Sequence, residues 1–216
     1  RQQREVSLFT DRIGSRPLFF TQTGSGLLFS SRIQTIGLYP DITPDFDRRC
    51  LAEFFSVQKV FGTATPISGV RKISPGAILG SNLDGSVRFE RTYWQPKYRP
   101  VRRSSSKVAR EIVDTVKEVL DERLRDDLEY GVLLSGGSDS RLVLGAMVEL
   151  GYAPTAFHMT NWLSREARSA ERVALEAGVD LRILRRNADY HDQLLELVPK
   201  FSNFVGAFDE SIASGF

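Results

Sequence analysis

The second half of the chain alternates between short apolar runs and longer stretches with apolar residues at helical spacing. The runs typical of strands cover 130–135, 153–160 and 179–186, and the helical stretches cover 108–124, 140–150, 164–178 and 190–201. Strands that alternate with helices indicate βαβ units and a parallel sheet. The run 130–134 is continuously apolar, as expected of a central parallel strand that is covered on both faces. The sequence therefore predicts an α/β parallel-sheet domain over residues 108–216.

Residues 1–98 have a different character, because short β-rich runs separated by turn residues dominate them. Such runs lie at 5–11, 17–22 and 26–31, and two more, at 69–82 and 88–94, flank an Asp84-Gly85 pair that is typical of a β-hairpin turn. This half is predicted to be an α+β unit that is mostly β.

One helix is expected in the first half, at 45–57. Asp45 or Asp47 is expected to be its N-cap, and the apolar face is expected to contain Leu51, Phe54 and Phe55. Cys50 adjoins that face and is predicted to pack in the core, since no second cysteine or nearby histidine suggests another role.

A connector between the halves is expected at 99–107, within the basic, proline-containing stretch 95–107. The helix that follows it is expected to be capped by one of the serines Ser104–Ser106. With 216 residues, 41% of them hydrophobic, the chain is large enough for one large domain or two small ones.

Composition also bears on compartment and partners. The chain has 29 basic and 27 acidic residues, and this near balance argues against nucleic-acid binding as the main activity. A single cysteine cannot form an internal disulfide, so a cytoplasmic location is expected. No apolar run approaches the ~20 residues that span a bilayer, so no membrane association is expected. The first residue is Arg1 rather than Met, so we expect the sequence to begin within a longer protein.

The segment that joins the first predicted strand of the second half to its helix reads Ser-Gly-Gly-Ser-Asp-Ser, at 135–140. In parallel sheets, ligands gather at the carboxyl ends of strands. Gly136 and Gly137 can adopt positive φ, and successive N–H groups in such a loop bind anions. The start of the following helix adds unpaired N–H groups and a positive dipole, and Ser135 and Ser140 add hydroxyl groups. The segment predicts a site for phosphate or pyrophosphate.

Asp139 is the unusual member of this segment, because a carboxylate repels a polyanion. Its presence is explained if Mg²⁺ bridges it to phosphate oxygens. The alternative is that Asp139 is only the N-cap of the helix and the glycines form a tight turn. No Gly-Lys-Ser/Thr follows the loop, and Gly-x-Gly-x-x-Gly does not occur, so neither a Walker loop nor a dinucleotide fingerprint is present.

The stretch LLSGGSDSRLVL, at 133–144, resembles the pyrophosphate loop of the N-type ATP pyrophosphatases, which include asparagine, GMP, NAD and argininosuccinate synthetases. The first half of the chain indicates which of these synthetases it resembles. The stretches at 11–36 and 67–94 resemble the late strands and the closing segment of the N-terminal-nucleophile glutaminase domain of asparagine synthetases. The chain thus resembles the asparagine synthetase-like class II glutamine amidotransferases from about Asp11 to Asp180. β-Lactam synthetases and lasso-peptide cyclases could share this pattern.

This resemblance implies that 1–98 is the C-terminal part of a glutaminase domain, 99–107 a linker and 108–216 the N-terminal part of an ATP pyrophosphatase domain. It assigns Mg²⁺ to Asp139, and Met159 matches the position whose backbone contacts adenine. The residues that match the loop holding the ATP phosphates are Leu134, Ser135, Gly136, Gly137, Ser138, Asp139 and Ser140.

The implied activity is adenylation of a carboxylate, that of aspartate or an analogue, by ATP with Mg²⁺. Pyrophosphate is released, and ammonia from glutamine then forms the amide. A related adenylating synthetase that makes a lactam or macrocycle, and a non-catalytic nucleotide-binding module, stay open as alternatives, as does a homodimer. The partners are otherwise expected to be small molecules.

The chain departs from the family pattern at several positions. The family's nucleophilic cysteine is N-terminal, whereas this chain begins with Arg1, and the later catalytic Glu and Lys would lie beyond Phe216, so no catalytic residue is assigned. Ser138 stands where Leu is common, and Arg141 stands where Ser is common. Two isolated histidines make a poor metal site, so His158 is expected to be a core or surface residue. The charged residues of 164–178 are expected to be solvated and salt-bridged, with only Arg165 and Glu166 near the ligand-binding edge.

Overall fold

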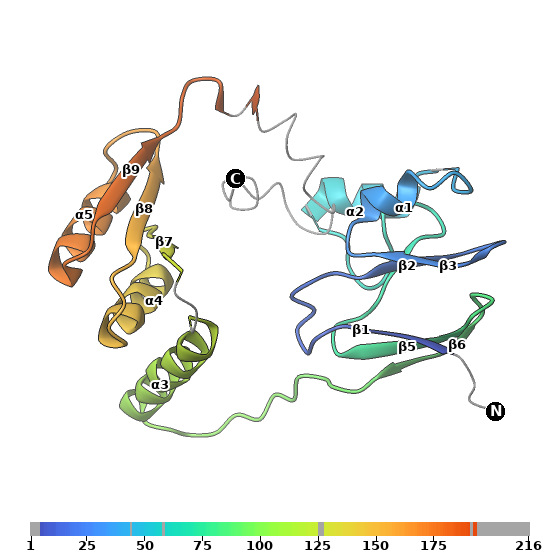
Figure 1. The fold of residues 1–216 in the computed structure, drawn as a ribbon, viewed down its shortest axis with the longest axis horizontal. Coiled ribbons are helices and arrows are strands. Elements are labelled where there is room, and N and C mark those ends of the chain that lie inside the picture. The colour runs from blue at the N-terminus through green and yellow to red at the C-terminus, as the bar shows by residue number, and fades with distance from the viewer. Residues whose placement is uncertain (1–4, 44, 58, 125–127, 191, 194–216) are drawn as a thin grey trace. The chain divides into compact units, whose positions relative to one another are not determined.

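The computed structural model describes residues 5–190 except 44, 58 and 125–127, together with residues 192 and 193. The chain forms two compact units, and it passes from one to the other between Tyr98 and Arg99 (Figure 1). The helix expected at 190–201 lies almost entirely outside the described residues.

The first unit contains two antiparallel three-stranded sheets, with strand orders β1-β5-β6 and β3-β2-β4 (Figure 1). The short runs predicted as strands are confirmed, but the run 69–82 is divided between the two sheets. A turn at Pro75 and Gly76, whose φ is +62°, separates its two strands. The elements of this unit are β1 Glu5–Phe9, β2 Phe19–Thr23, β3 Gly26–Ser30, α1 Ile33–Gly37, α2 Arg48–Val57, β4 Arg71–Lys72, β5 Ala77–Asn82 and β6 Val87–Thr92.

Strand β2 is covered on both faces. Phe19 and Phe20 are adjacent and point to opposite faces, yet only 1% and 4% of their surfaces are exposed. Phe19 packs with Ile33 and Ile36 of α1, whereas Phe20 packs in a cluster with Leu79 of β5. This unit therefore has three layers: α1, the β3-β2-β4 sheet and the β1-β5-β6 sheet.

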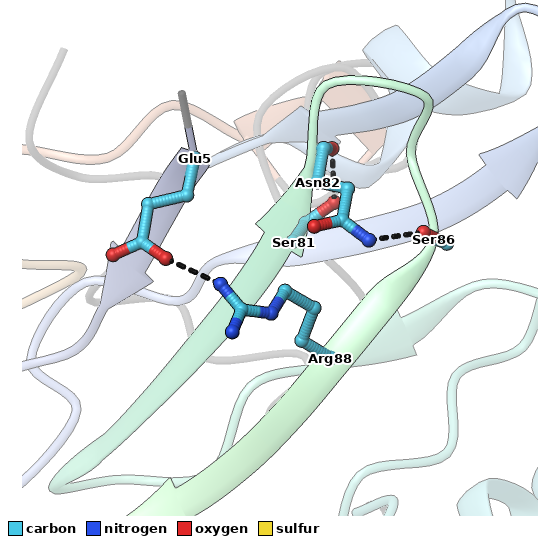
Figure 2. Close-up of polar contacts among 5 residues, drawn as sticks. All are labelled: Glu5, Ser81, Asn82, Ser86 and Arg88. Carbon is cyan, nitrogen blue, oxygen red and sulfur yellow. Dashed lines mark hydrogen bonds and ion pairs between the residues drawn. The ribbon is translucent and has the colours of Figure 1, made fainter. Parts of the chain in front are cut away.

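The hairpin predicted at Asp84-Gly85 is confirmed, because β5 and β6 pair in antiparallel fashion around it. Gly85 has φ +85°, which favours glycine. Asn82 Nδ2 donates to Ser86 Oγ at 2.8 Å across the hairpin (Figure 2). An ion pair of 2.7 Å joins Glu5 of β1 to Arg88 of β6 and spans β5 between them (Figure 2). Both side chains are partly exposed, so this pair contributes at most about 1 kcal/mol.

The structure resolves the open N-cap alternative for α2 in favour of Asp47. Its Oδ1 accepts hydrogen bonds from the backbone N–H groups of Arg49 and Cys50, at 2.9 and 3.1 Å. Cys50 is buried as predicted, with 2% of its surface exposed. The predicted apolar face is wrong at Phe55, which is 80% exposed. The helical spacing of the apolar residues identified the apolar face of α2, but it did not show which edge of that face packs against the rest of the unit.

The second unit is an α/β domain with a parallel sheet in the order β7-β8-β9, which confirms the predicted arrangement. Its helix α3 has Ser104 as N-cap, so the last three residues of the predicted linker, 105–107, are helical. In the described ranges, no helix combines the length and the hydrophobicity that a membrane-spanning segment needs. The elements are α3 Ser105–Arg123, β7 Gly131–Leu133, α4 Ser138–Glu149, β8 Thr155–Thr160, α5 Arg165–Ala177 and β9 Leu181–Arg185.

Helices α4 and α5 cover the same face of this sheet, since they share one core with β8, as expected for two right-handed crossovers that advance in one direction. Ala156 of β8 is fully buried in a core that includes Leu144 of α4 and Ala170 of α5. On the opposite face, Leu133 is 58% exposed. Within the described sheet β8 is central and β7 pairs only with β8, so the prediction that β7 is a central strand covered on both faces is wrong. A continuous apolar run indicates a buried strand but not its place in the strand order.

Candidate functional site

The segment Ser135–Ser140 lies at the carboxyl end of β7 and leads into α4. Its two ends are tied together by serines. Ser135 N–H donates to Ser140 Oγ at 3.2 Å, and the two hydroxyl oxygens are 3.1 Å apart. Gly137 N–H donates to Ser135 Oγ at 3.3 Å. These contacts hold the segment as a closed loop, while the residues between its ends are exposed or partly exposed.

Only one of the two loop glycines uses positive φ. Gly136 has φ +80°, and a β-carbon there would be 2.7 Å from the carbonyl oxygen of Glu166 in α5. Gly137 has φ −75° and is the N-cap of α4, so the expectation of positive φ at both glycines is wrong at Gly137. A β-carbon at Gly137 would meet only Ser135 Oγ, at 3.4 Å. Close approach to α5 therefore requires glycine at 136 and not at 137.

Several amide groups of the loop are unpaired. Helix α4 begins at Ser138, two residues earlier than predicted, and its first amides have no intrahelical acceptor. Across the part of the chain that the structure describes, no acceptor is found for the backbone N–H groups of Gly136, Ser138, Asp139 and Ser140. Such a row of N–H groups at a helix N-terminus favours binding of an anion.

Asp139 is the second residue of α4 and is exposed. The N-cap is Gly137, which excludes the alternative that Asp139 serves only as the cap. Asp139 Oδ1 accepts a hydrogen bond from Ser138 Oγ at 3.1 Å. No group of three or more His, Cys, Asp or Glu that could hold a metal occurs among the described residues. A lone exposed carboxylate beside unpaired amides fits Mg²⁺ that is also bound by phosphate oxygens and water.

Arg141 contacts the loop itself. Its Nε donates to the carbonyl oxygen of Gly137 at 3.1 Å, and its side chain is exposed. The sequence left open whether this residue faces solvent or phosphate. In the structure it braces the N-cap of α4 from the solvent side.

Met159 lies near the carboxyl end of β8, in the strand next to the loop. Thr155 N–H donates to Tyr130 O at 3.1 Å, so the peptide groups of Thr155 point toward β7. Met159 lies four residues further along β8, and its N–H and C=O point to the same side because the direction of peptide groups alternates along a strand with a period of two residues. Strand β7 ends at Leu133. No acceptor is found for Met159 N–H in the described part of the chain, so this peptide forms a free sheet edge beside Ser135.

A pocket of about 400 Å³ lies beside Gly136, and α5 forms most of its wall. Its lining residues include Glu166 and the three arginines Arg165, Arg168 and Arg172. Among the described residues, none of these three arginines has a carboxylate partner within 4.0 Å. Arg168 and Arg172 are exposed, as expected, but the expected salt bridges are not found for them among the described residues. The three arginines are spaced by three and four residues, which puts them on one face of α5, but the sequence does not show that this face meets the loop.

Two family models match the chain in succession. Residues 1–94 match the glutamine amidotransferase domain, and residues 111–213 match asparagine synthase. Together with the relatives below, these matches show that the chain belongs to the asparagine synthetase-like family. A glutamine amidotransferase region is followed here by a region of the adenylating synthetase type.

Individual relatives agree with this family. "Asparagine synthetase [glutamine-hydrolyzing] 1" of Bacillus subtilis (strain 168) is 27% identical over 203 residues, which are 94% of this chain and 31% of that relative. "Asparagine synthetase [glutamine-hydrolyzing] 3" of the same strain is 30% identical over 134 residues, 62% of this chain and 22% of the relative. "Microcin J25-processing protein McjC" of Escherichia coli is 22% identical over 183 residues, 82% of this chain and 33% of the relative. The chain thus spans about a third or less of the length of these relatives.

Proposed function

We propose that this chain belongs to an ATP-dependent amidotransferase of the asparagine synthetase type. A carboxylate oxygen of the substrate attacks the α-phosphorus of ATP, and pyrophosphate leaves. Ammonia from glutamine then attacks the acyl carbon, and AMP leaves as the amide forms. The observation that carries this proposal is the row of unpaired amides at Gly136 and Ser138–Ser140, beside the exposed carboxylate of Asp139.

The loop acts by electrostatics in this proposal. Negative charge grows on the departing pyrophosphate, and fixed N–H dipoles stabilise that charge without having to reorganise. Ser135 and Ser140 hold the two ends of the loop so that the amides converge. Asp139 would hold Mg²⁺, and bound Mg²⁺ would neutralise part of the phosphate charge. The substrates supply the covalent chemistry.

The peptide of Met159 is proposed to recognise the base. Its N–H and C=O lie at the free edge beyond the end of β7, so they can pair with the donor and acceptor of a purine edge. The loop would then bind the phosphates of the same nucleotide, since Ser135 directly follows Leu134 at that edge. Base and phosphates can bind next to each other because the parallel sheet brings the carboxyl ends of β7 and β8 together.

The first unit is proposed to be the C-terminal part of a glutaminase domain (1–98). Residues 99–107 would connect it to the synthetase domain (108–216). Cys50 is buried within α2 and is not N-terminal, so it is not assigned as the glutaminase nucleophile. The catalytic groups of both reactions stay unassigned in this chain.

A second candidate is an adenylating synthetase that closes a lactam or macrocycle within its substrate. The match to the microcin J25-processing protein over 82% of this chain favours it. The departures from the common loop pattern at Ser138 and Arg141 are compatible with a substrate other than aspartate. The two candidates share the adenylation step and differ in the nucleophile that attacks the acyl-adenylate.

Pyrophosphate release from ATP, measured with aspartate and either glutamine or ammonia, tests the proposal. We expect release in the wild-type protein and none in Asp139→Ala, while Asp114→Ala, which changes an exposed acid of α3, should behave as wild type. Mass spectrometry separates the candidates, because a lactam or macrocycle contains no added nitrogen. ATP binding without release for any carboxylate would instead indicate a non-catalytic module, and absence of both would reject the proposal.

A further inference from the structure

His158 is a buried polar residue next to the free peptide of Met159. Only 3% of its surface is exposed, and its Nδ1 lies 2.7 Å from the carbonyl oxygen of Leu134. A carbonyl oxygen can only accept, so Nδ1 must carry the proton and donate. Nε2 is also buried and has no partner among the described residues. Burial of an imidazole with one unpaired nitrogen is costly and calls for an explanation.

The hydrogen bond of His158 occupies a position in the β7–β8 ladder. Leu134 N–H donates to Phe157 O at 2.8 Å, which is the last backbone bond between these two segments. If the parallel ladder continued, the carbonyl of Leu134 would accept from Met159 N–H. That bond is absent from the described part of the chain, and the His158 side chain takes the carbonyl instead.

We propose that His158 is a positioning residue that ends the β7–β8 ladder at Leu134 and thereby keeps the Met159 N–H available to a purine edge. The inference rests on the proposed function, because it takes adenine as the group that approaches Met159. His158 itself does not touch the nucleotide; it acts through the backbone of Leu134.

The burial of Leu134 explains why a side chain is needed there. Leu134 is 1% exposed, and a buried carbonyl requires a hydrogen-bond donor. Without the imidazole, the donor within reach is Met159 N–H, and their pairing would extend β7 by one bond and close the edge.

Two ligands and two variants test this role. Mg·ATP has a base and Mg·tripolyphosphate does not, so the ratio of their affinities, measured by calorimetry, isolates the contribution of the base. In His158→Leu, the ratio of the affinity for Mg·ATP to that for Mg·tripolyphosphate should fall about tenfold, while the affinity for tripolyphosphate itself should change by less than about twofold. His158→Asn, whose amide can donate from the position of Nδ1, should keep most of the ratio. An unchanged ratio in His158→Leu would overturn the inference while leaving the proposed function intact.

Amide hydrogen exchange of the wild-type protein without nucleotide provides a readout that needs no variant. The Met159 amide should exchange faster than that of Phe157, which lies within the ladder, and Mg·ATP should slow it. Equal protection of the two amides in the free protein would also overturn the inference. If wild-type protein binds neither ATP nor tripolyphosphate, the proposed function fails, and the inference fails with it.

Discussion

Gly136 packs directly against the carbonyl oxygen of Glu166, so that a β-carbon at position 136 would be 2.7 Å from that oxygen. The contact joins the loop after β7 to the first turn of α5. It restricts the path of the loop at Gly136, next to the unpaired amides of Gly136 and Ser138–Ser140. The conformation of the loop thus depends on a residue outside the loop.

Gly136→Ala tests this contact. The methyl group must displace the Glu166 backbone, and alanine must adopt φ +80°, which together should cost about 1–3 kcal/mol of folding stability and weaken binding of Mg·ATP at least tenfold. Gly145→Ala is the matched control, because a β-carbon at this α4 position meets no atom within 4 Å. That control should be neutral or stabilising by up to about 1 kcal/mol. Wild-type affinity in Gly136→Ala would contradict the proposed role of the contact.

Arg168→Gln and Arg172→Gln test the pocket beside Gly136. Three arginines and one glutamate are among its lining residues, so each substitution should weaken binding of pyrophosphate several-fold at low ionic strength. The difference should shrink near 1 M salt, where the screening length is about 3 Å. Titrations of pyrophosphate at both salt concentrations measure the effect, and Arg110→Gln, on the exposed side of α3, is the control. Equal loss in the control would remove the pocket from the account.

Asp11 predicts an acid-sensitive turn in the first unit. The Ser15 hydroxyl and then the Ser15 backbone N–H donate to this carboxylate and hold its pKa below the usual value. A carboxyl whose pKa is lower in the folded state stabilises the fold above its unfolded pKa, near 3.9, and this contribution is lost as pH falls through the folded pKa. Asp11→Asn should therefore lower Tm at pH 7 and reduce its decline between about pH 4 and pH 2. Parallel curves of Tm against pH for the two proteins would contradict this.

Cys50 should be unreactive in the folded protein. Burial, followed by the nearby charges of Asp47 and Glu53, raises the pKa of its thiol and so suppresses the reactive thiolate. A chromogenic disulfide reagent at pH 8 should label the thiol slowly in buffer and rapidly in denaturant. Rapid stoichiometric labelling in buffer would show that α2 is not packed as described.

Much of the second unit was predictable, because the spacing of its apolar residues alternates along the sequence between the pattern of a strand and that of a helix. The parallel sheet follows from the alternation of strands and helices along 108–186, and the loop at the end of β7 and the helix after it follow from residues 130–150. The order of strands did not follow, and neither did the conformation of Gly137. Both depend on contacts between segments that are distant in sequence, and glycine itself permits either sign of φ.

The candidate site was predictable only where its residues are consecutive. Ser135–Ser140 form one loop, so their convergence is a local property. Arg168 and Arg172 reach Gly136 only because the sheet places α5 next to the loop. His158 was expected to be an ordinary core or surface histidine, since the register that brings Nδ1 to the Leu134 carbonyl cannot be read from either segment alone.

Amide chemical shifts recorded while Mg·ATP is added show whether the loop amides bind the nucleotide phosphates. We expect the N–H resonances of Gly136, Ser138 and Asp139 to shift progressively and saturably, while those of Gly151 and Gly178, which follow the carboxyl ends of α4 and α5, stay in place. Asp139→Ala should require far more nucleotide to produce the same shifts. Loop resonances that do not move at millimolar Mg·ATP would contradict the assignment of this loop to the nucleotide phosphates.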